Sequence, residues 1–427
     1  MGLAILLGIF ALLTVVGVPV AFALGMAAIS AFWYEGLPLM IGFQRIVAGM
    51  STFSLLAIPF FIFAGELMLH GGIAARLIRL ASASVGWMRG GLGQVNVFSS
   101  MLFGGISGSA VADVSALGSL LIPVMKEKGY DDDYAVNVTV SSSIAGILIP
   151  PSHNMILYVV AAGGGISVAS LFIAGIVPGI LMCLMLGFVA RRIAIRKNFP
   201  TEEFAGWRFV FVAFIASFPG LVTAIIVVGG ALSGIFTVTE SGAIGALYAI
   251  VITGFVYRSL SLKDFWIAVI RSVKTTGMVM ILVGCAGAFG YMLALYEVPK
   301  VLAGALTSVS DNPIVIFLLM NLILLLLGMI MDMAALILIC TPIFLPVAVG
   351  LGMDPIQFGV MLMMNLGLGL CTPPVGGCLF VGCAIGGVPI QRAVKSIWPF
   401  YLAILAALML VTYIPAVSMT LPSWINP

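Results

Sequence analysis

Three hydroxyl side chains and one carboxylate stand inside strongly apolar stretches of this sequence. Ser107 and Ser109 flank Gly108 in the tract GGISGSAVAD, Ser152 follows two prolines in ILIPPSHN, and Asp332 interrupts the aliphatic run GMIMDM. Hydroxyl, carbonyl and carboxylate oxygens are hard ligands, which suit Na⁺ and need no change of protonation to bind it. A carboxylate at membrane depth is costly, so Asp332 is a candidate for direct cation binding or for carrying a proton.

Two proline pairs mark a second set of candidate positions. Pro150-Pro151 and Pro373-Pro374 each lie in a stretch apolar enough to cross a membrane. Proline lacks the backbone N–H and clashes with the preceding turn, so each pair breaks the helix that contains it. The freed carbonyl groups can bind a cation, and the half-helix that follows presents a positive N-terminus to an anion. Thr372 and Gly376, on either side of the second pair, could complete a second cation site.

Each candidate also has a plainer structural role. The serines of the first tract fit helix capping or close helix packing as well as cation binding. Asp113, one helical turn beyond that tract, fits a capping or structural hydrogen bond equally well. His153 and Asn154 follow the first break, where a polar residue often only starts a helix, and the role of His153 stays open.

The sequence thus gives two overlapping candidate sets. The sodium-binding candidates are Ser107, Gly108, Ser109, Pro150, Ser152, Gly328, Asp332, Thr372, Pro373 and Gly376. The substrate-binding candidates are Ser107, Asp113, Pro151, Asn154 and Pro374. Since no Lys or Arg falls in the predicted membrane centre, an anionic substrate would be held by helix N-termini, hydroxyls and bound cations. The alternative is a neutral or protonated substrate.

Other ionisable residues lie near the ends of apolar stretches, where solvated or structural roles are the simpler interpretation. Glu66 and His70 share one such end. Thr237 and Glu240 predict a capping box that opens the next helix. The acidic run Asp131–Asp133 predicts another helix start with favourable placement on the helix dipole.

The composition places these residues in a membrane protein. Of 427 residues, 62% are hydrophobic and only 8% are charged, whereas a soluble domain carries roughly a quarter charged residues. Runs of about 20 apolar residues recur along the chain, each long enough to cross a bilayer. The net charge of +3 is too small to suggest nucleic acid. The 6 Cys lie in apolar segments without metal-site spacing, so we expect them to be small buried residues.

The apolar pattern predicts an all-α polytopic fold of about nine full crossings. These are expected at 2–34, 52–70, 134–163, 168–190, 209–235, 240–257, 275–296, 356–386 and 394–419. The stretches 93–126 and 313–350 have glycine-rich or charged midpoints, and each half is marginal in length for a crossing. We therefore predict two re-entrant helical hairpins there, and two discontinuous helices at 134–163 and 356–386.

The basic residues orient this layout. With the N-terminus in the cytoplasm, sixteen of the 18 Lys and Arg residues fall on the cytoplasmic side, and only Arg45 and Lys300 fall outside. This asymmetry agrees with the positive-inside rule. It predicts a periplasmic C-terminus, a first hairpin that enters from the cytoplasm, and a second hairpin that enters from the opposite face.

An internal repeat relates the two hairpins. Gly105 and Gly328 are 223 positions apart, and the same offset relates further glycines, prolines and aspartates. The other pairs are Pro123 with Pro346, Gly129 with Gly352, Asp131 with Asp354, Gly146 with Gly369, Pro150-Pro151 with Pro373-Pro374, and Gly163-Gly164 with Gly386-Gly387. Glycine and proline fix backbone shape, so the repeat conserves geometry within the chain. The odd span at 209–235 turns the second copy upside down.

Inverted repeats with broken helices are typical of secondary transporters, which bind their substrate near the midplane between the repeats. The predicted organisation is 1–70 first scaffold helices, 71–165 first transport module, 166–296 scaffold and connecting helices, 297–390 second transport module and 391–427 C-terminal scaffold helix. A channel is the alternative from another class, although inverted halves suit alternating access better than a symmetric pore. The spans contain no HExxH or Ser/His/Asp set, and no GxxxxGK[ST] motif occurs, so neither an enzyme nor ATP drive is predicted.

Several motifs resemble one family over almost the whole chain. SGSAVAD (107–113), IPPS (149–152), SGIFTVTESGA (233–243), GMIMD (328–332) and TPPVG (372–376) are similar to the large, DctM-like membrane subunit of tripartite ATP-independent periplasmic (TRAP) transporters. FSLLAIPFFIFAGELM (53–68) and IAGIVPG (173–179) add to the resemblance.

The resemblance implies an elevator mechanism, in which a scaffold holds a mobile domain built from hairpins and broken helices. It implies sodium-driven import of an organic acid across the bacterial inner membrane. It also implies a soluble periplasmic binding protein and a small, DctQ-like membrane subunit, expected here as a separate chain. The sodium site carried over from the family falls on Ser107, Ser109, Ser152, Asp332 and Thr372. C4-dicarboxylates, sialic acid, other sugar acids and keto acids all stay open, as does a carrier that works without a binding protein.

Overall fold

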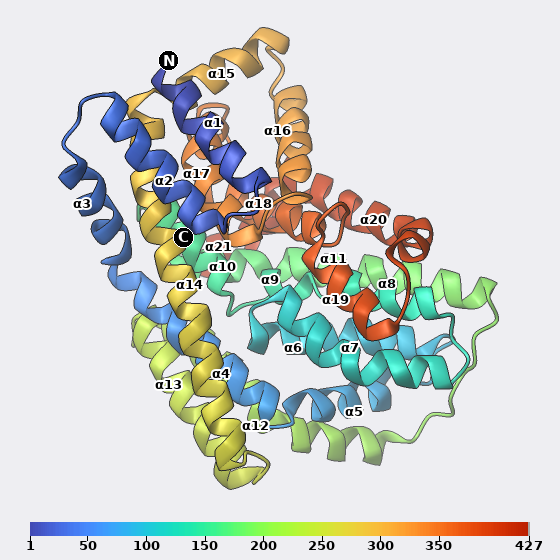
Figure 1. Ribbon diagram of the computed structural model, residues 1–427. Helices are drawn as coiled ribbons and strands as arrows, with labels where there is room; N and C mark the ends of the chain where they lie inside the picture. The colour runs from blue at the N-terminus through green and yellow to red at the C-terminus, as the bar shows by residue number, and fades with distance from the viewer. Residues whose placement is uncertain (426–427) are drawn as a thin grey trace.

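The computed structural model describes residues 1–425, which fold into helices and their connections only (Figure 1). The predicted all-α class is therefore confirmed. The chain opens with α1 (Gly2–Val15), α2 (Val20–Tyr34), α3 (Leu39–Met50), the short 3₁₀ helix η1 (Phe53–Leu56), α4 (Ala57–His70) and α5 (Ile73–Val85).

The prediction of one crossing over 2–34 is wrong. α1 and α2 are separate helices that pack against each other. The turn between them contains Gly17, at φ +91°, and Pro19, which precedes the first residue of α2. A left-handed glycine ends a helix and a proline cannot continue one, so two residues split a stretch of uniform hydropathy.

The hairpin of α1 and α2 returns the chain to the end where it began. A Cβ atom placed on Gly2 would lie 2.2 Å from Glu35 Oε1 and from the hydroxyl of Tyr296. Tyr296 follows the long helix α14 (Leu262–Leu295), whereas Lys263 is near its start. The N-terminus and Lys263 thus lie at opposite ends of α14, although the sequence placed them on one side.

A helical hairpin and a broken helix are present at the first pair of predicted positions. α6 (Gly91–Ser107) and α7 (Ala110–Glu127) make the hairpin, followed by α8 (Asp132–Ser142) and α9 (Ala145–Leu148). After Pro150-Pro151 the chain resumes as α10 (His153–Ala161), and the two halves of this span meet at a bend of 53°. α8 begins directly after Asp131, as the acidic run predicts.

The second copy has the same elements. They are α16 (Pro313–Gly328), α17 (Met333–Gly350), α18 (Pro355–Leu370) and, after Pro373-Pro374, α19 (Gly377–Gly386). The 223-residue offset carries both ends of α7 onto the ends of α17. Both proline pairs contain a cis peptide bond. The repeat read from glycines and prolines is therefore a repeat of structure.

Further helices, most of them long, connect and flank the two copies. They are α11 (Val168–Arg196), α12 (Trp207–Leu232), α13 (Val238–Val251) with its π-helical extension η2 (Ile252–Val256), α14, α15 (Val298–Val309), α20 (Ile390–Tyr413) and α21 (Pro415–Ile425). The predicted capping box at the start of α13 is present: the Thr237 hydroxyl accepts from Glu240 N–H, and Thr237 N–H donates to Glu240 Oε2 at 2.7 Å.

By length and composition, seven helices within residues 1–425 can each cross a membrane, and eight spans result if the bent pair at Pro150 counts as one. The sequence predicted about nine. The difference lies in 2–34, which splits into two helices, and in 356–386, whose halves are short. One half of the second hairpin, Met333–Gly350, is by itself long enough to cross. A membrane protein with several crossings is the result.

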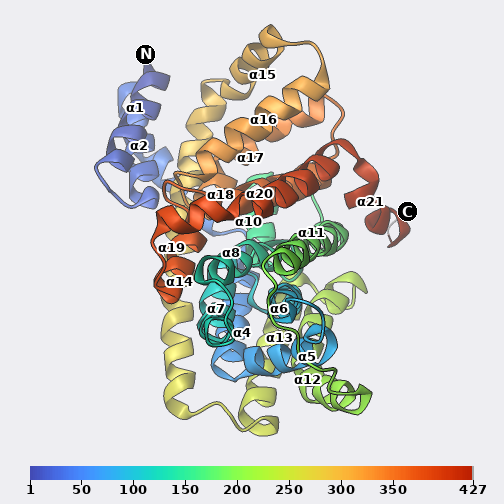
Figure 2. The same ribbon diagram turned by 90° about the vertical axis from the view of Figure 1, so that its right-hand side faces the viewer.

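The two modules interlock (Figure 2). The second helix of each hairpin packs on the half-helix that follows the break of the other copy: α7 contacts α19, and α17 contacts α10. α8 and α18 form the centre, since every residue of 133–142 and of 357–369 is buried. A Cβ atom on Gly367 would lie 2.9 Å from Ile144, its partner at the same offset, so the pseudo-twofold axis passes close to this contact.

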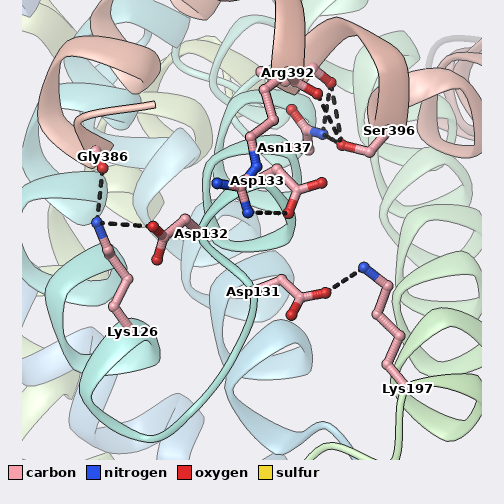
Figure 3. Close-up of polar contacts among 10 residues, drawn as sticks. Lys126, Asp131, Asp132, Asp133, Asn137, Lys197, Gly386, Arg392 and Ser396 are labelled. Atoms are coloured by element: carbon pink, nitrogen blue, oxygen red, sulfur yellow. Dashed lines mark hydrogen bonds and ion pairs between the residues drawn. The ribbon is translucent and has the colours of Figure 1, made fainter. Parts of the chain in front are cut away.

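Acidic residues at the start of α8 tie one rim of the first module together (Figure 3). Lys126 Nζ lies 3.4 Å from Asp132 and donates to the Gly386 carbonyl at 2.9 Å. Lys197 pairs with Asp131, and Arg392 lies 3.9 Å from Asp133. The ends of α7 and α11 and the start of α20 therefore meet at one end of the molecule, which agrees with their predicted placement on one side.

Candidate functional site

The tip of the first hairpin rests on the first proline break. α6 ends at Ser107, Gly108 adopts a left-handed conformation at φ +62°, and Ser109 opens α7. A Cβ atom on Gly108 would lie 2.9 Å from the Pro151 carbonyl oxygen, and one on Gly105 would lie 3.1 Å from that of Pro150. Only glycine permits so close an approach of the two backbones.

Oxygen atoms gather at this contact. The Ser107 hydroxyl lies 3.5 Å from the Ser109 carbonyl oxygen, too long for a strong hydrogen bond. Ser152 is completely buried, and its hydroxyl has no hydrogen-bond partner among the described residues. A buried hydroxyl without a partner is costly unless something binds it. The arrangement suits a bare cation that takes carbonyl and hydroxyl oxygens.

The second tip meets the second break through glycine as well. A Cβ atom on Gly369 would lie 2.6 Å from the carbonyl carbon of Gly328. Beyond this contact, Val375 N–H donates to the Met329 carbonyl at 3.0 Å. In the first copy the close contact is made one residue earlier than the offset gives, since a Cβ on Gly104 would lie 2.9 Å from Gly146.

Thr372 and Gly376 bracket the second break as predicted. The Thr372 hydroxyl donates to the Leu368 carbonyl at 2.7 Å, which leaves its oxygen lone pairs able to accept or bind a cation. Gly376 has φ +39°, and a Cβ there would lie 2.8 Å from the Thr372 carbonyl oxygen. Pro373 is half-buried and Pro374 is exposed beside them.

Asp332 combines a structural bond with exposure to a cavity. It caps α17, because its Oδ1 accepts from Ala334 N–H at 2.9 Å. It also lines a cavity of about 300 Å³, together with Ser109, the residue of the first tip at the same offset. His153 and Asn154, at the start of α10, line the same cavity. The two tips and the half-helix after the first break therefore open onto one space.

Three helix N-termini face this cavity. The lining residues include the first residues of α7, α10 and α17, and no Lys or Arg belongs to its wall. Unpaired N–H groups and the helix dipole favour an anion at such N-termini. The Asp332 carboxylate at the same wall favours a cation. Together they suit the paired binding of a cation and an organic anion.

Asp113 lies apart from this arrangement. It is one turn into α7 and 1% exposed, and its carboxylate interacts with the Ser100 side chain. The walls of the cavity at the tips do not include it. The structure thus brings Ser109, Asn154 and Asp332 together and places Asp113 within the first module.

Two residues at a neighbouring cavity escaped the sequence analysis. Glu66 and Arg271 line a second cavity beside Ser107 and Ser109. The sequence suggested that Glu66 lies at the end of a span and that Arg271 lies in a cytoplasmic loop. Arg271 belongs to α14, which starts 13 residues before the expected span at 275–296. Its spacing of four from Thr275 places both on one helix face, a signal that an earlier helix start would have revealed.

Comparison with known proteins gives a consistent assignment. The family described as "Tripartite ATP-independent periplasmic transporter, DctM component" matches residues 7–417. A relative from Salmonella typhimurium, named uncharacterized protein YgiK, is 41% identical over 99% of this chain and 98% of its own. The C4-dicarboxylate TRAP transporter large permease protein of Rhodobacter capsulatus is 36% identical over 99% of each chain. The sialic acid TRAP transporter large permease protein of Vibrio cholerae is 38% identical over 95% of each.

Two solved structures share the fold at low sequence identity. The YdaH transporter of Alcanivorax borkumensis superposes with a TM-score of 0.64 at 16% identity, covering 91% of this chain and 89% of its own. MtrF of Neisseria gonorrhoeae superposes with a TM-score of 0.58 at 14% identity, covering 86% and 82%.

The family match and the permease relatives agree with the prediction that the chain is not an enzyme. The chain belongs to the DctM family, the large membrane permease component of tripartite ATP-independent periplasmic transporters.

Proposed function

We propose that this permease imports a small organic acid together with Na⁺ across the bacterial inner membrane. The observation that carries the proposal is the single cavity onto which both hairpin tips and the start of α10 open, with Asp332 in its wall. Sodium is bound at the two breaks, by carbonyl oxygens and by the hydroxyls of Ser107, Ser152 and Thr372. The acid is held by the N-termini of α7, α10 and α17 and by the bound cations.

An elevator movement fits the position of this cavity. Its wall consists of module residues on one side and of Thr275, Met278 and Leu282 of α14 on the other. A site at the boundary between a module and a long helix changes its exposure when the module slides along that helix. In this arrangement the two hairpins re-enter from opposite faces of the membrane. The rim that contains Lys126, Lys197 and Arg392 (Figure 3) then faces the cytoplasm.

The family supports the proposed substrate class and partners. Two of the relatives named above are permeases for C4-dicarboxylates and for sialic acid, which supports a carboxylic acid as the substrate. A tripartite system consists of this chain, a small membrane subunit and a periplasmic binding protein that delivers the acid. Vesicles that carry both membrane subunits should take up the acid only when the binding protein is added outside. Uptake without it would assign the chain to carriers that work alone.

Asp332→Asn tests the cation site. Asn caps a helix as well as Asp does, so α17 persists while the charge is lost. We expect the sodium concentration for half-maximal uptake to rise about tenfold or more, the effect of losing one charged ligand. The measurement is uptake of labelled succinate or sialic acid into vesicles on an inward sodium gradient.

Asp354→Asn is the matched control. Asp354 caps α18 in the same way, with its Oδ1 accepting from Ile356 N–H at 2.7 Å, but it is outside the cavity walls. Asp354→Asn should leave the sodium concentration for half-maximal uptake unchanged. If both variants behave alike, capping rather than cation binding is the role of Asp332.

A further inference from the structure

A second cavity adjoins the one between the tips. It has a volume of about 300 Å³ and shares four wall residues with the first cavity, namely Ser109, Val111, His153 and Thr275. Its remaining wall comes from α4, from Phe103 and Ser107 of α6, from Ala112 and Ser115 of α7, and from Arg271 in the first half of α14. The two spaces are therefore neighbours along the boundary between the first module and the helices α4 and α14.

A chain of residues on α14 links the two spaces. Arg271 lines the second cavity, Thr275 lines both, and Met278 and Leu282 line the first. These positions recur every three to four residues and so share one face of the helix. From Leu282 to Arg271 the helix rises by about 16 Å at 1.5 Å per residue. A substrate that leaves the tips along α14 meets Arg271 at the end of this path.

Arg271 is held there by a loose ion pair. Its Nη1 lies 3.9 Å from Glu66 Oε2, beyond the distance of a bidentate guanidinium–carboxylate contact. Glu66 Oε2 is buried and has no hydrogen-bond partner among the described residues; its other ionic neighbour, His70 Nδ1, lies 3.7 Å away. The Arg271 side chain is 57% exposed. The guanidinium therefore has donors free for a second carboxylate.

We propose that Arg271 is the exit-side receptor for the acid carried by this permease. The guanidinium takes the carboxylate of the substrate after it leaves the two tips, and Glu66 competes for the same donors. This competition keeps the affinity of Arg271 for the substrate carboxylate low. A site on a transport path must bind its substrate strongly enough for entry and weakly enough for release. Arg271 lies toward the Lys263 end of α14, so the exit is on the side where the positive-inside bias places the cytoplasm.

This inference rests on the proposed import of an organic acid, and inhibition by accumulated product tests it. Vesicles with both membrane subunits are loaded with increasing concentrations of unlabelled acid, and sodium-driven uptake of labelled acid is started by binding protein outside. The external protein selects permeases in one orientation. The acid is the one that wild type takes up among succinate, malate, sialic acid and pyruvate. The luminal concentration that halves uptake reports binding at the exit.

The two members of the pair have opposite expected effects. Arg271→Gln should raise the half-inhibiting luminal concentration about tenfold, the factor for one charge-assisted contact at a partly exposed site. Glu66→Gln should lower it, because the substrate then has no competitor for the guanidinium. Lys274→Gln removes a positive charge three residues away on an exposed part of α14, outside both walls, and should change nothing.

The outcomes separate the two proposals. If wild type imports none of the four acids on a sodium gradient, the proposed function fails and this inference with it. If import proceeds but Arg271→Gln leaves product inhibition unchanged, or shifts it in the same direction as Glu66→Gln, the inference alone is overturned. Where Arg271→Gln does not insert into the membrane, Arg271→Met replaces it. That variant keeps a long side chain but loses the charge and all donors, so an unchanged half-inhibiting concentration also overturns the inference.

Discussion

At the scale of single residues, the informative groups are buried oxygens that lack a partner. Ser152 and Ser99 are both completely buried, and neither hydroxyl has a hydrogen bond within the described part of the chain. Only Ser152 adjoins a proline break and a hairpin tip. Burial without a partner is thus shared by the two serines, whereas the position beside freed carbonyl groups is not.

Ser152→Ala should therefore raise the sodium concentration for half-maximal uptake by about three- to tenfold, because a neutral ligand contributes about 1 kcal/mol. Ser99→Ala removes an equivalent hydroxyl two turns before the tip and should leave the titration unchanged. Sodium-dependent uptake at fixed binding protein measures both. If the two variants need the same sodium concentration for half-maximal uptake, Ser152 has only a packing role.

The sequence could predict that Asp332 lies at the second tip, but not that Arg271 lines a cavity beside the first tip. A carboxylate inside an aliphatic run is conspicuous, and its position was fixed by the repeat. Arg271 stands among other basic residues at the start of a helix, where charge is ordinary. Its cavity exists only because α4 supplies Glu66 and the first tip supplies Ser107 from positions far away in the chain.

At the scale of helices, glycine pairs decide how closely each hairpin approaches its broken helix. Gly369 touches the backbone of Gly328 so closely that a methyl group would lie 2.6 Å from its carbonyl carbon. Backbone atoms cannot move aside as a side chain can. The cost of a methyl group there falls on the contact between the second tip and the second break.

Gly369→Ala should lower the free energy of unfolding by about 1–3 kcal/mol and weaken sodium binding at the second break, because tip and break are forced apart. Gly350→Ala is the control, since a Cβ there would meet nothing within 4 Å. Thermal unfolding in detergent and the sodium titration check both. If Gly369→Ala unfolds at the same temperature as wild type, the second tip and the second break can move apart without loss of stability.

The broken helices could be predicted because proline and glycine act through covalent geometry, which needs no knowledge of the fold. The same residues also explain the error at 2–34. Gly17 and Pro19 are the signal of a turn, but they stand in a stretch whose hydropathy is continuous. Whether a Gly–Pro turn bends a crossing or ends it depends on what the two helices pack against, here each other and α14.

At the scale of the whole molecule, the two modules repeat one order of helices and interlock, and we predict that they are inverted relative to each other. α8 and α18 pack in the centre, and α11 lies against α20 beside them. Lys126 lies at the rim of Figure 3, near the end of α7. Gly350 is at the end of α17, the equivalent helix of the other copy. Inversion requires these two ends to face opposite sides of the membrane.

Single cysteines at Lys126 and Gly350 should therefore react with a membrane-impermeant maleimide from opposite sides of the membrane. The 6 native cysteines are buried, so the background of labelling is low. Right-side-out and inside-out vesicles provide the comparison. Labelling of both positions from one side would contradict the inverted arrangement and with it alternating access.

The swapped contacts of α7 with α19 and of α17 with α10 also govern how the chain is made. α19 begins at Gly377, about 250 residues after α7 ends at Glu127, so at roughly 5–20 residues per second α7 waits on the order of 10 to 50 s for its partner. During synthesis, the surface of α7 that later contacts α19 is therefore left without its partner until the ribosome has made the second module. Its survival during that interval depends on the insertion machinery rather than on the finished core.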